Sequence, residues 1–140
     1  MIVLDTNVIS ELARPRPNDN VCRWIYGQGP DALYLCVVVV MEQAFGARKF
    51  ESRTGSDRYV RALDILVTVE FRGRILGHDQ HTALLAGRLR ALRQNIGRPI
   101  SVQDAMIAAI CLSSGAALAT RNTKDFEGLD LVLINPFEDL

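Results

Sequence analysis

The sequence lacks any hydrophobic run long enough to cross a membrane. Its longest apolar run covers residues 33–41, whereas a membrane-spanning helix needs roughly 20 apolar residues. The N-terminus carries no basic region ahead of Asp5, so it lacks the pattern of a secretory signal peptide. We therefore expect a cytoplasmic protein that makes no contact with membranes.

Cysteine is scarce, and no nucleoside triphosphate-binding motif is present. Three cysteines without a C-x-x-C pair predict neither a disulfide framework nor a zinc knuckle. Cys36 and Cys111 lie in apolar runs, which is typical of small buried side chains in a protein from a reducing compartment. The sequence has no G-x-x-x-x-G-K-[ST] loop, which argues against an NTPase.

The sequence also has no excess of charge of either sign, because 16 acidic residues balance 16 basic ones. No global basic field therefore indicates nucleic-acid binding. All the basic residues except Lys49 and Lys124 are arginines, which form planar, bidentate contacts with phosphate. Two basic clusters are either solvated helix faces or contacts to an RNA backbone. They are Arg48, Lys49, Arg53, Arg58 and Arg61, and Arg88, Arg90, Arg93 and Arg98.

Apolar runs of strand length alternate with segments of helical spacing. The predicted strands cover residues 2–4, 32–38, 74–76, 117–120 and 131–134, and the predicted helices cover residues 8–12, 18–26, 42–52, 56–69, 80–95 and 102–113. This alternation predicts βαβ units. We expect a single α/β domain over residues 1–140, with a three-layer α/β/α sandwich around a mainly parallel sheet.

Three carboxylates are placed at predicted strand ends or helix starts. Ligands of open parallel sheets bind at the carboxyl ends of the strands, where residues 5–7 and 120–122 should meet. Asp5 follows the first strand directly, and Glu42 and Asp104 are expected in the first turns of their helices. Each has a purely structural alternative. Asp5 could be a helix N-cap, Glu42 could complement a helix dipole, and Asp104 could form a capping box with Ser101.

Taken together, the three carboxylates indicate a cation site. Like charges held close together raise one another's pKa unless a cation intervenes. Mg²⁺ or Mn²⁺ is the natural ion for a site made only of oxygen ligands. Such an ion can activate water and neutralise charge on a phosphate, so we expect a phosphodiester hydrolase.

Five stretches along nearly the whole chain form an ordered set of motifs. They are residues 1–11, Glu42 with Gly46 after a valine-rich run, residues 100–109 around Asp104, residues 119–126, and residues 133–137. The set resembles the PIN-domain ribonucleases of the VapC toxin family, and FitB-like members in particular. The resemblance implies an endoribonuclease that depends on Mg²⁺ or Mn²⁺ and is the toxin of a type II toxin–antitoxin system.

The resemblance also implies roles for individual residues. Asp5, Glu42 and Asp104 correspond to metal ligands and catalytic residues, and Asn122 takes the fourth catalytic position. That position often holds aspartate in the family, so the site has one negative charge fewer here. The candidate substrate contacts are Thr6, Thr120, Arg121 and Asp125.

The implied partners are an RNA substrate, a second copy of the chain in a homodimer, and a cognate antitoxin of the VapB or FitA kind. In the family, the antitoxin tail occupies a groove of the toxin, and DNA is bound only through the antitoxin. Two alternatives stay open. The chain could act mainly as an antitoxin-binding partner with weak or no nuclease activity, or it could cleave DNA, since the sequence does not reveal recognition of a 2′-hydroxyl.

Overall fold

A parallel sheet forms the centre of the computed structural model, which describes residues 1–138; positions 139 and 140 of the predicted domain lie outside the described residues. Within that range five strands pair in the order β3-β2-β1-β4-β5. Every pair is parallel, as predicted. The strands are β1 (Ile2–Leu4), β2 (Leu33–Cys36), β3 (Ile75–Leu76), β4 (Ala117–Ala119) and β5 (Leu133–Ile134).

The strand order reverses between β1 and β4. From β1 the chain proceeds to β2 and β3 on one side, and it returns through β4 and β5 on the other. Leu4 pairs with Ala119 at the end of these two strands, and the Asp5 amide still donates to the Ala119 carbonyl at 2.9 Å. The residues after β1 and β4 therefore meet at the switch point, where parallel sheets bind their ligands.

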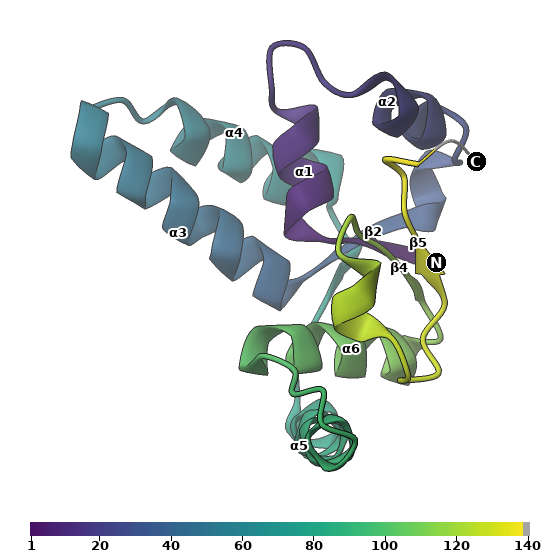
Figure 1. Ribbon diagram of the computed structural model, residues 1–140. Coiled ribbons are helices and arrows are strands. Elements are labelled where there is room, and N and C mark those ends of the chain that lie inside the picture. Colours follow the sequence, from purple (N-terminus) through teal and green to yellow (C-terminus); the bar gives the residue numbers. More distant parts are fainter. Residues whose placement is uncertain (139–140) are drawn as a thin grey trace.

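Helices cover both faces of the sheet and make it the middle layer (Figure 1). On one side lie α1 (Thr6–Leu12) and α2 (Asp19–Tyr26). On the other, α6 (Val102–Ser114) packs on the sheet and α5 (Gln80–Asn95) packs on α6. Short 3₁₀ turns, η1 (Pro30–Ala32) and η3 (Thr123–Phe126), precede β2 and follow β4. The predicted three-layer α/β/α architecture is confirmed.

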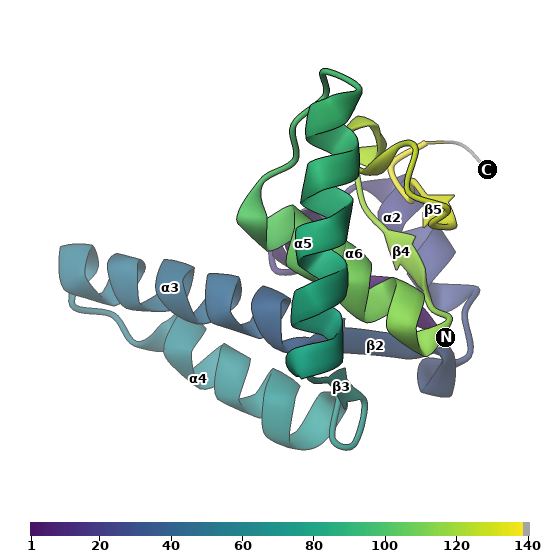
Figure 2. The same ribbon diagram turned by 90° about the horizontal axis from the view of Figure 1, so that it is seen from below.

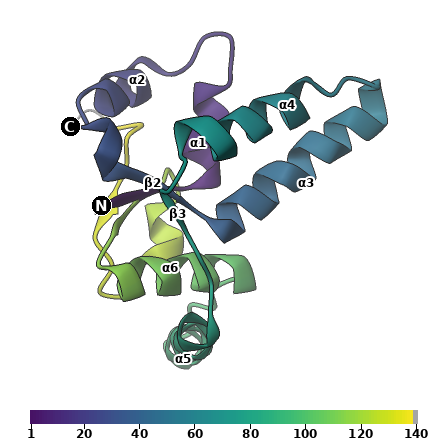
Figure 3. The same cartoon turned by 180° about the vertical axis from the view of Figure 1, so that it is seen from behind.

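Two further helices form an arm that extends beyond the sheet (Figures 2 and 3). They are α3 (Val37–Thr54) and α4 (Arg58–Ile65), which continues into the π-helical segment η2 (Leu66–Glu70). The two helices pack against each other along their length. None of the helices in the described part of the chain is long and apolar enough to span a bilayer.

The valine run after β2 is helical, so the predicted strand over residues 32–38 was too long. β2 ends at Cys36 and α3 begins at Val37. Valine disfavours helices only weakly, and tertiary packing routinely overrides that preference. Val38 and Val39 are almost fully buried, so packing against the core determines their conformation.

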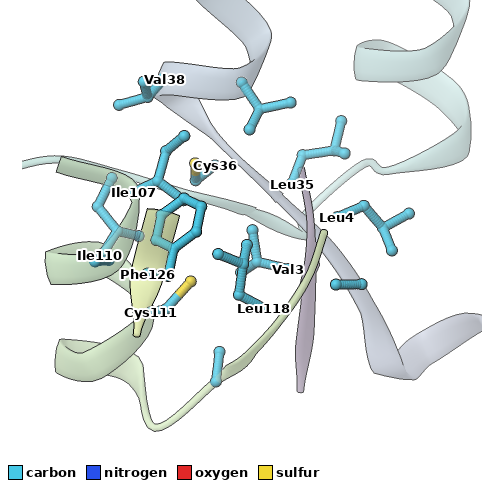
Figure 4. Close-up of a cluster of buried hydrophobic side chains, with 14 of the residues drawn as sticks. Val3, Leu4, Leu35, Cys36, Val38, Ile107, Ile110, Cys111, Leu118 and Phe126 are labelled. Atoms are coloured by element: carbon cyan, nitrogen blue, oxygen red, sulfur yellow. The ribbon is translucent and has the colours of Figure 1, made fainter. Parts of the chain in front are cut away.

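Apolar side chains from the central strands and α6 fill the space between these layers (Figure 4). Val3, Leu118, Ile107 and Phe126 are each at most 1% exposed. Cys36 and Cys111 are free and buried among them, as predicted. The core thus fixes β1, β4 and α6 relative to one another, and these elements carry or precede the candidate site residues.

Candidate functional site

Asp5 is a buried carboxylate with both oxygens hydrogen-bonded. Its Oδ1 accepts from the Thr6 amide at 2.8 Å, which makes it the N-cap of α1. Its Oδ2 accepts from the Thr120 hydroxyl at 2.8 Å and from Asn7 Nδ2 at 3.4 Å. Burial raises the pKa of Asp5 above its ordinary value, and the charge of Asp125 adds to this, while the hydrogen bonds oppose it. Asp5 therefore caps α1 through Oδ1, whereas Oδ2 belongs to a separate hydrogen-bond network.

Thr120 is the centre of that network. Its side chain is fully buried, and its hydroxyl accepts from Asn7 Nδ2 at 3.2 Å and from the Asn122 amide at 3.1 Å while it donates to Asp5. Asn7 Oδ1 in turn accepts from the Arg121 amide at 3.0 Å. Thr120 therefore holds Asp5 in place, which shifts its expected role from substrate contact to positioning.

Glu42 approaches the same edge from α3, in the second helical turn rather than the predicted first one. The Thr6 hydroxyl donates to Glu42 Oε2 at 2.7 Å. Gln43 Nε2 donates to the Ser10 hydroxyl at 3.1 Å and to the Thr6 carbonyl at 3.4 Å. These contacts fix α3 against α1, so Thr6 also positions a carboxylate.

Asp104 lies in the first turn of α6, as predicted. The Ser101 hydroxyl caps this helix by accepting from the Asp104 amide at 3.1 Å. Partial burial raises the pKa of Asp104 to about 6, and the charges of Asp5, Asp125 and Glu42 contribute to the increase. Asp104 therefore shares one electrostatic environment with the other acidic residues, although they come from distant parts of the sequence.

The rim of the site contains the remaining candidates, all solvent-exposed. Arg121 stacks its guanidinium 4.6 Å from the centre of the Phe137 ring. Asn122 and Asp125 follow on the same segment, and the Asp125 amide donates to the Asn122 carbonyl at 3.0 Å. These three residues are open to a ligand, in contrast to buried Thr120.

The donor set is suited to a hard divalent cation. Asp5, Glu42 and Asp104 offer only oxygen, and their unbalanced charges are those that a cation stabilises. Within residues 1–138, no three acidic, histidine or cysteine side chains are close enough to hold an ion together. Mg²⁺ commonly binds one or two carboxylates directly and keeps several waters, so these three carboxylates are suited to hold such an ion.

Two residues of the site were missed from sequence. Asn7 links Asp5, Thr120 and Arg121, and Gln43 ties α3 to α1. Asn7 could have been found, because it is the third polar residue after β1 and belongs to a segment predicted to lie at the ligand edge. Gln43 gave no such indication, since its partners depend on where α3 begins.

A groove of about 980 Å³ opens beside the carboxylates, between α1, α3 and α4. Thr6 and Glu42 line its end at the site. Elsewhere its walls are mostly apolar, with Ile9, Leu12, Phe50, Leu63 and Leu66 among the lining residues. The site therefore continues into a surface suited to an apolar segment of a partner.

Thr120→Val is expected to destabilise the protein by about 1–3 kcal/mol, the usual cost of leaving buried polar groups without partners. Valine has nearly the same shape, but it removes the donor to Asp5 and the acceptor for Asn7. Urea denaturation measures the change in the free energy of unfolding. Thr54→Val at an exposed position of α3 is the matched control. Equal losses in the two variants would show that the network does not hold this edge together.

The sequence is similar to known proteins along its whole length. The PIN domain family matches residues 2–130. The plasmid stability protein StbB of Pseudomonas syringae pv. tomato is 37% identical over 138 residues, which cover 99% of each chain. The toxin FitB of Neisseria gonorrhoeae is 32% identical over 139 residues, covering 99% of this chain and 100% of FitB. The VapC ribonuclease Y4jK of Sinorhizobium fredii is 36% identical over 138 residues, covering 99% of each.

The fold agrees with these matches. The solved structure of FitAB bound to an IR36 DNA fragment contains a chain that superposes with a TM-score of 0.90 at 30% identity, covering 100% of this chain and 98% of that one. Sequence and fold thus point to the same group over nearly all the residues described. The chain belongs to the PIN-domain family.

Proposed function

We propose that this protein is a metal-dependent endoribonuclease and the toxin of a toxin–antitoxin pair. The observation that carries the proposal is the convergence of Asp5, Glu42 and Asp104 from three elements on one edge of the sheet. Similarity to a VapC ribonuclease and to a toxin over 99% of the chain supports the same reaction and role.

In this proposal Asp5, Glu42 and Asp104 would hold Mg²⁺ or Mn²⁺, some of them through bound water molecules, which Mg²⁺ commonly keeps. When bound, the ion supplies an activated water and offsets the charge that develops on the phosphate. Thr120 and Asn7 orient the Asp5 carboxylate, and Thr6 orients Glu42. These hydrogen bonds keep the carboxylates from turning away, which is the usual task of residues that surround metal ligands.

The exposed rim would receive the RNA. Arg121 carries a delocalised charge on a planar group that suits a phosphate oxygen pair, and its stacking on Phe137 fixes its direction. Asn122 offers a neutral amide oxygen beside it. The absence of a carboxylate at that position favours one cation over two, because each added cation needs compensating negative charge.

The same asparagine supports a second candidate function, in which the protein mainly holds an antitoxin and cleaves RNA weakly or not at all. Under that hypothesis Asn122→Asp would raise cleavage by restoring a charge at the site. Under the main proposal the wild-type protein is already active, and the substitution changes mostly the affinity for the cation.

The partner in either case would be an antitoxin whose segment lies in the groove between α1, α3 and α4. The apolar lining suits an amphipathic segment, and Thr6 and Glu42 at one end bring that segment to the carboxylates. A similar chain forms the FitAB assembly on DNA. We accordingly propose that this toxin reaches DNA only through its antitoxin. From the family resemblance we also propose that it forms a homodimer.

The test is cleavage of total RNA by the purified, antitoxin-free protein with Mg²⁺ or Mn²⁺. We expect discrete fragments that disappear when EDTA removes the ion, because water activation depends on it. The cognate antitoxin should also suppress the fragments. A folded protein that cleaves equally well with EDTA would overturn the metal-dependent mechanism. No cleavage in either metal would favour the antitoxin-binding alternative.

A further inference from the structure

Arg93 is a buried arginine that the sequence predicted to lie on a solvated or RNA-binding face of α5. Its residue is only 4% exposed, so that prediction was wrong for this member of the cluster. The buried positions of α5 are Thr82, Ala86, Leu89 and Arg93, which follow helical spacing along one face. Burying a charge is costly unless hydrogen bonds compensate for it, and the partners of Arg93 therefore matter.

Those partners are backbone carbonyls of two separate loops. Nε donates to the Arg98 carbonyl at 2.6 Å. Nη1 donates to the carbonyls of Asp125 at 2.8 Å and Glu127 at 3.2 Å. A guanidinium can do this because its donors form a rigid planar fork, whereas a lysine has a single ammonium on a flexible stem. Arg93 therefore ties the loop before α6 to the turn η3.

A second arginine holds the same turn from the solvent side. Arg98 Nη2 donates to the Lys124 carbonyl at 3.3 Å and to the Glu127 carboxylate at 3.1 Å. This ion pair is about half exposed and therefore contributes little by itself. The two arginines together bind η3 on both sides, with the buried one making the stronger restraint.

The two loops that Arg93 joins both lead to acidic residues of the site. The loop around Arg98 runs into α6, which carries Asp104. The turn η3 carries Asp125, and a chain of hydrogen bonds links it to Asp5. The Asp125 amide donates to the Asn122 carbonyl, the Asn122 amide donates to the Thr120 hydroxyl, and that hydroxyl donates to Asp5. The charge of Asp125 accordingly adds to the raised pKa of both Asp5 and Asp104. Because Asn122 is neutral, Asp125 is the residue of this segment that can supply negative charge to the edge.

We propose that Arg93 is a positioning residue that holds Asp125 near Asp5 and Asp104, so that Asp125 strengthens cation binding in place of a carboxylate at position 122. Arg93 acts through its hydrogen bond to the Asp125 carbonyl and touches neither cation nor RNA. The inference rests on the proposed function, because it assumes that the carboxylates bind a divalent cation.

The experiment is a Mn²⁺ titration of the purified protein, with free Mn²⁺ measured by electron paramagnetic resonance. Arg93→Met should weaken Mn²⁺ binding about tenfold, the lower end of the range for residues that support metal ligands. Asp125→Asn should weaken it by a similar factor. In the double variant the loss should be no larger than for Asp125→Asn alone, because coupled residues are non-additive. Arg90→Met, at an exposed position of the same helix, should bind Mn²⁺ like the wild type.

The double-variant cycle separates positioning from general damage to the fold. The inference would be overturned if Arg93→Met still lowered the Mn²⁺ affinity tenfold in the Asp125→Asn background. It would also be overturned if folded Arg93→Met bound Mn²⁺ with wild-type affinity. If Arg93→Met does not fold, Arg93→Lys replaces it in the same cycle, since it retains the charge but not the fork. Asp5→Asn is titrated in parallel. Wild-type Mn²⁺ affinity in that variant would overturn the metal site itself, and the inference with it.

Discussion

Asp5→Asn is expected to reduce RNA cleavage by more than about 100-fold while the protein stays folded. The factor should exceed the 10- to 100-fold loss that follows when a residue merely supporting a metal ligand is removed. Asparagine keeps an oxygen that can accept from the Thr6 amide, and aspartate and asparagine are comparable helix N-caps. The substitution therefore removes the charge that would bind the cation and leaves the start of α1 intact.

The measurement is the rate of RNA cleavage in Mn²⁺, with circular dichroism to verify the fold. Asp19→Asn is the matched control, because Asp19 is an exposed aspartate in the first turn of α2. It should cleave at the wild-type rate. If Asp5→Asn also cleaved at that rate, the edge between β1 and β4 would not be the catalytic site.

The positions of Asp5 and Asp104 could be predicted because they depend on local rules. Asp5 directly follows a strand, and Asp104 lies three positions after the serine that caps its helix. The neighbouring sequence fixes both positions. The alternation of strands and helices then predicts a parallel sheet, and the carboxyl ends of its strands share one edge. Local structure and topology together were sufficient to bring these two residues to the same place.

The start of the helix that carries Glu42 could not be predicted from the local sequence. Four consecutive valines favour a strand by intrinsic preference, and the structure makes them the first turn of α3. The preference is worth less than 1 kcal/mol per residue, whereas burying a valine side chain contributes roughly 1.5–3 kcal/mol. The helix start therefore depends on the core around Val38 and Val39, which no local pattern describes.

The burial of Thr120 and Arg93 was not predicted, for a related reason. Thr120 was expected to contact the substrate on the strength of the family resemblance, and Arg93 to lie on a solvated or RNA-binding face of its helix. Each is buried and satisfied by partners far away in sequence, Thr120 by Asp5 and Arg93 by the η3 turn. For Arg93 the periodicity of α5 contained the information, since the position falls on the apolar face. For Thr120 the burial follows from the pairing of β4 between β1 and β5.

Metal-free protein carrying Asp104→Asn is expected to be more stable than the wild type at pH 7.5 and equally stable at pH 4. Folding raises the pKa of Asp104 from its ordinary value of 3.8 to about 6. Between these values the folded state binds more protons than the unfolded state, so stability falls as the pH rises through this window. Above this pH window the Asp104 carboxylate is charged in both states, and its charge lowers the free energy of unfolding by the largest amount. Asparagine carries no charge and removes that penalty.

A shift of roughly two pKa units corresponds to about 3 kcal/mol, but Asp104 is only partly buried, and solvent screening reduces the expected gain to about 1 kcal/mol.

Urea denaturation with EDTA at pH 4 and pH 7.5 measures the difference, with exposed Asp64→Asn as the control. Mn²⁺ should reverse the order at pH 7.5, because a cation that binds only the folded state stabilises the wild type more than a variant with a weakened site. Stabilities that coincide at both pH values would mean that neither burial nor the neighbouring acidic residues penalise the charged Asp104 carboxylate, and the charge argument for a cation at this edge would fail. A metal-free gain at pH 7.5 that Mn²⁺ does not reverse would instead show that this penalty exists without a cation to relieve it.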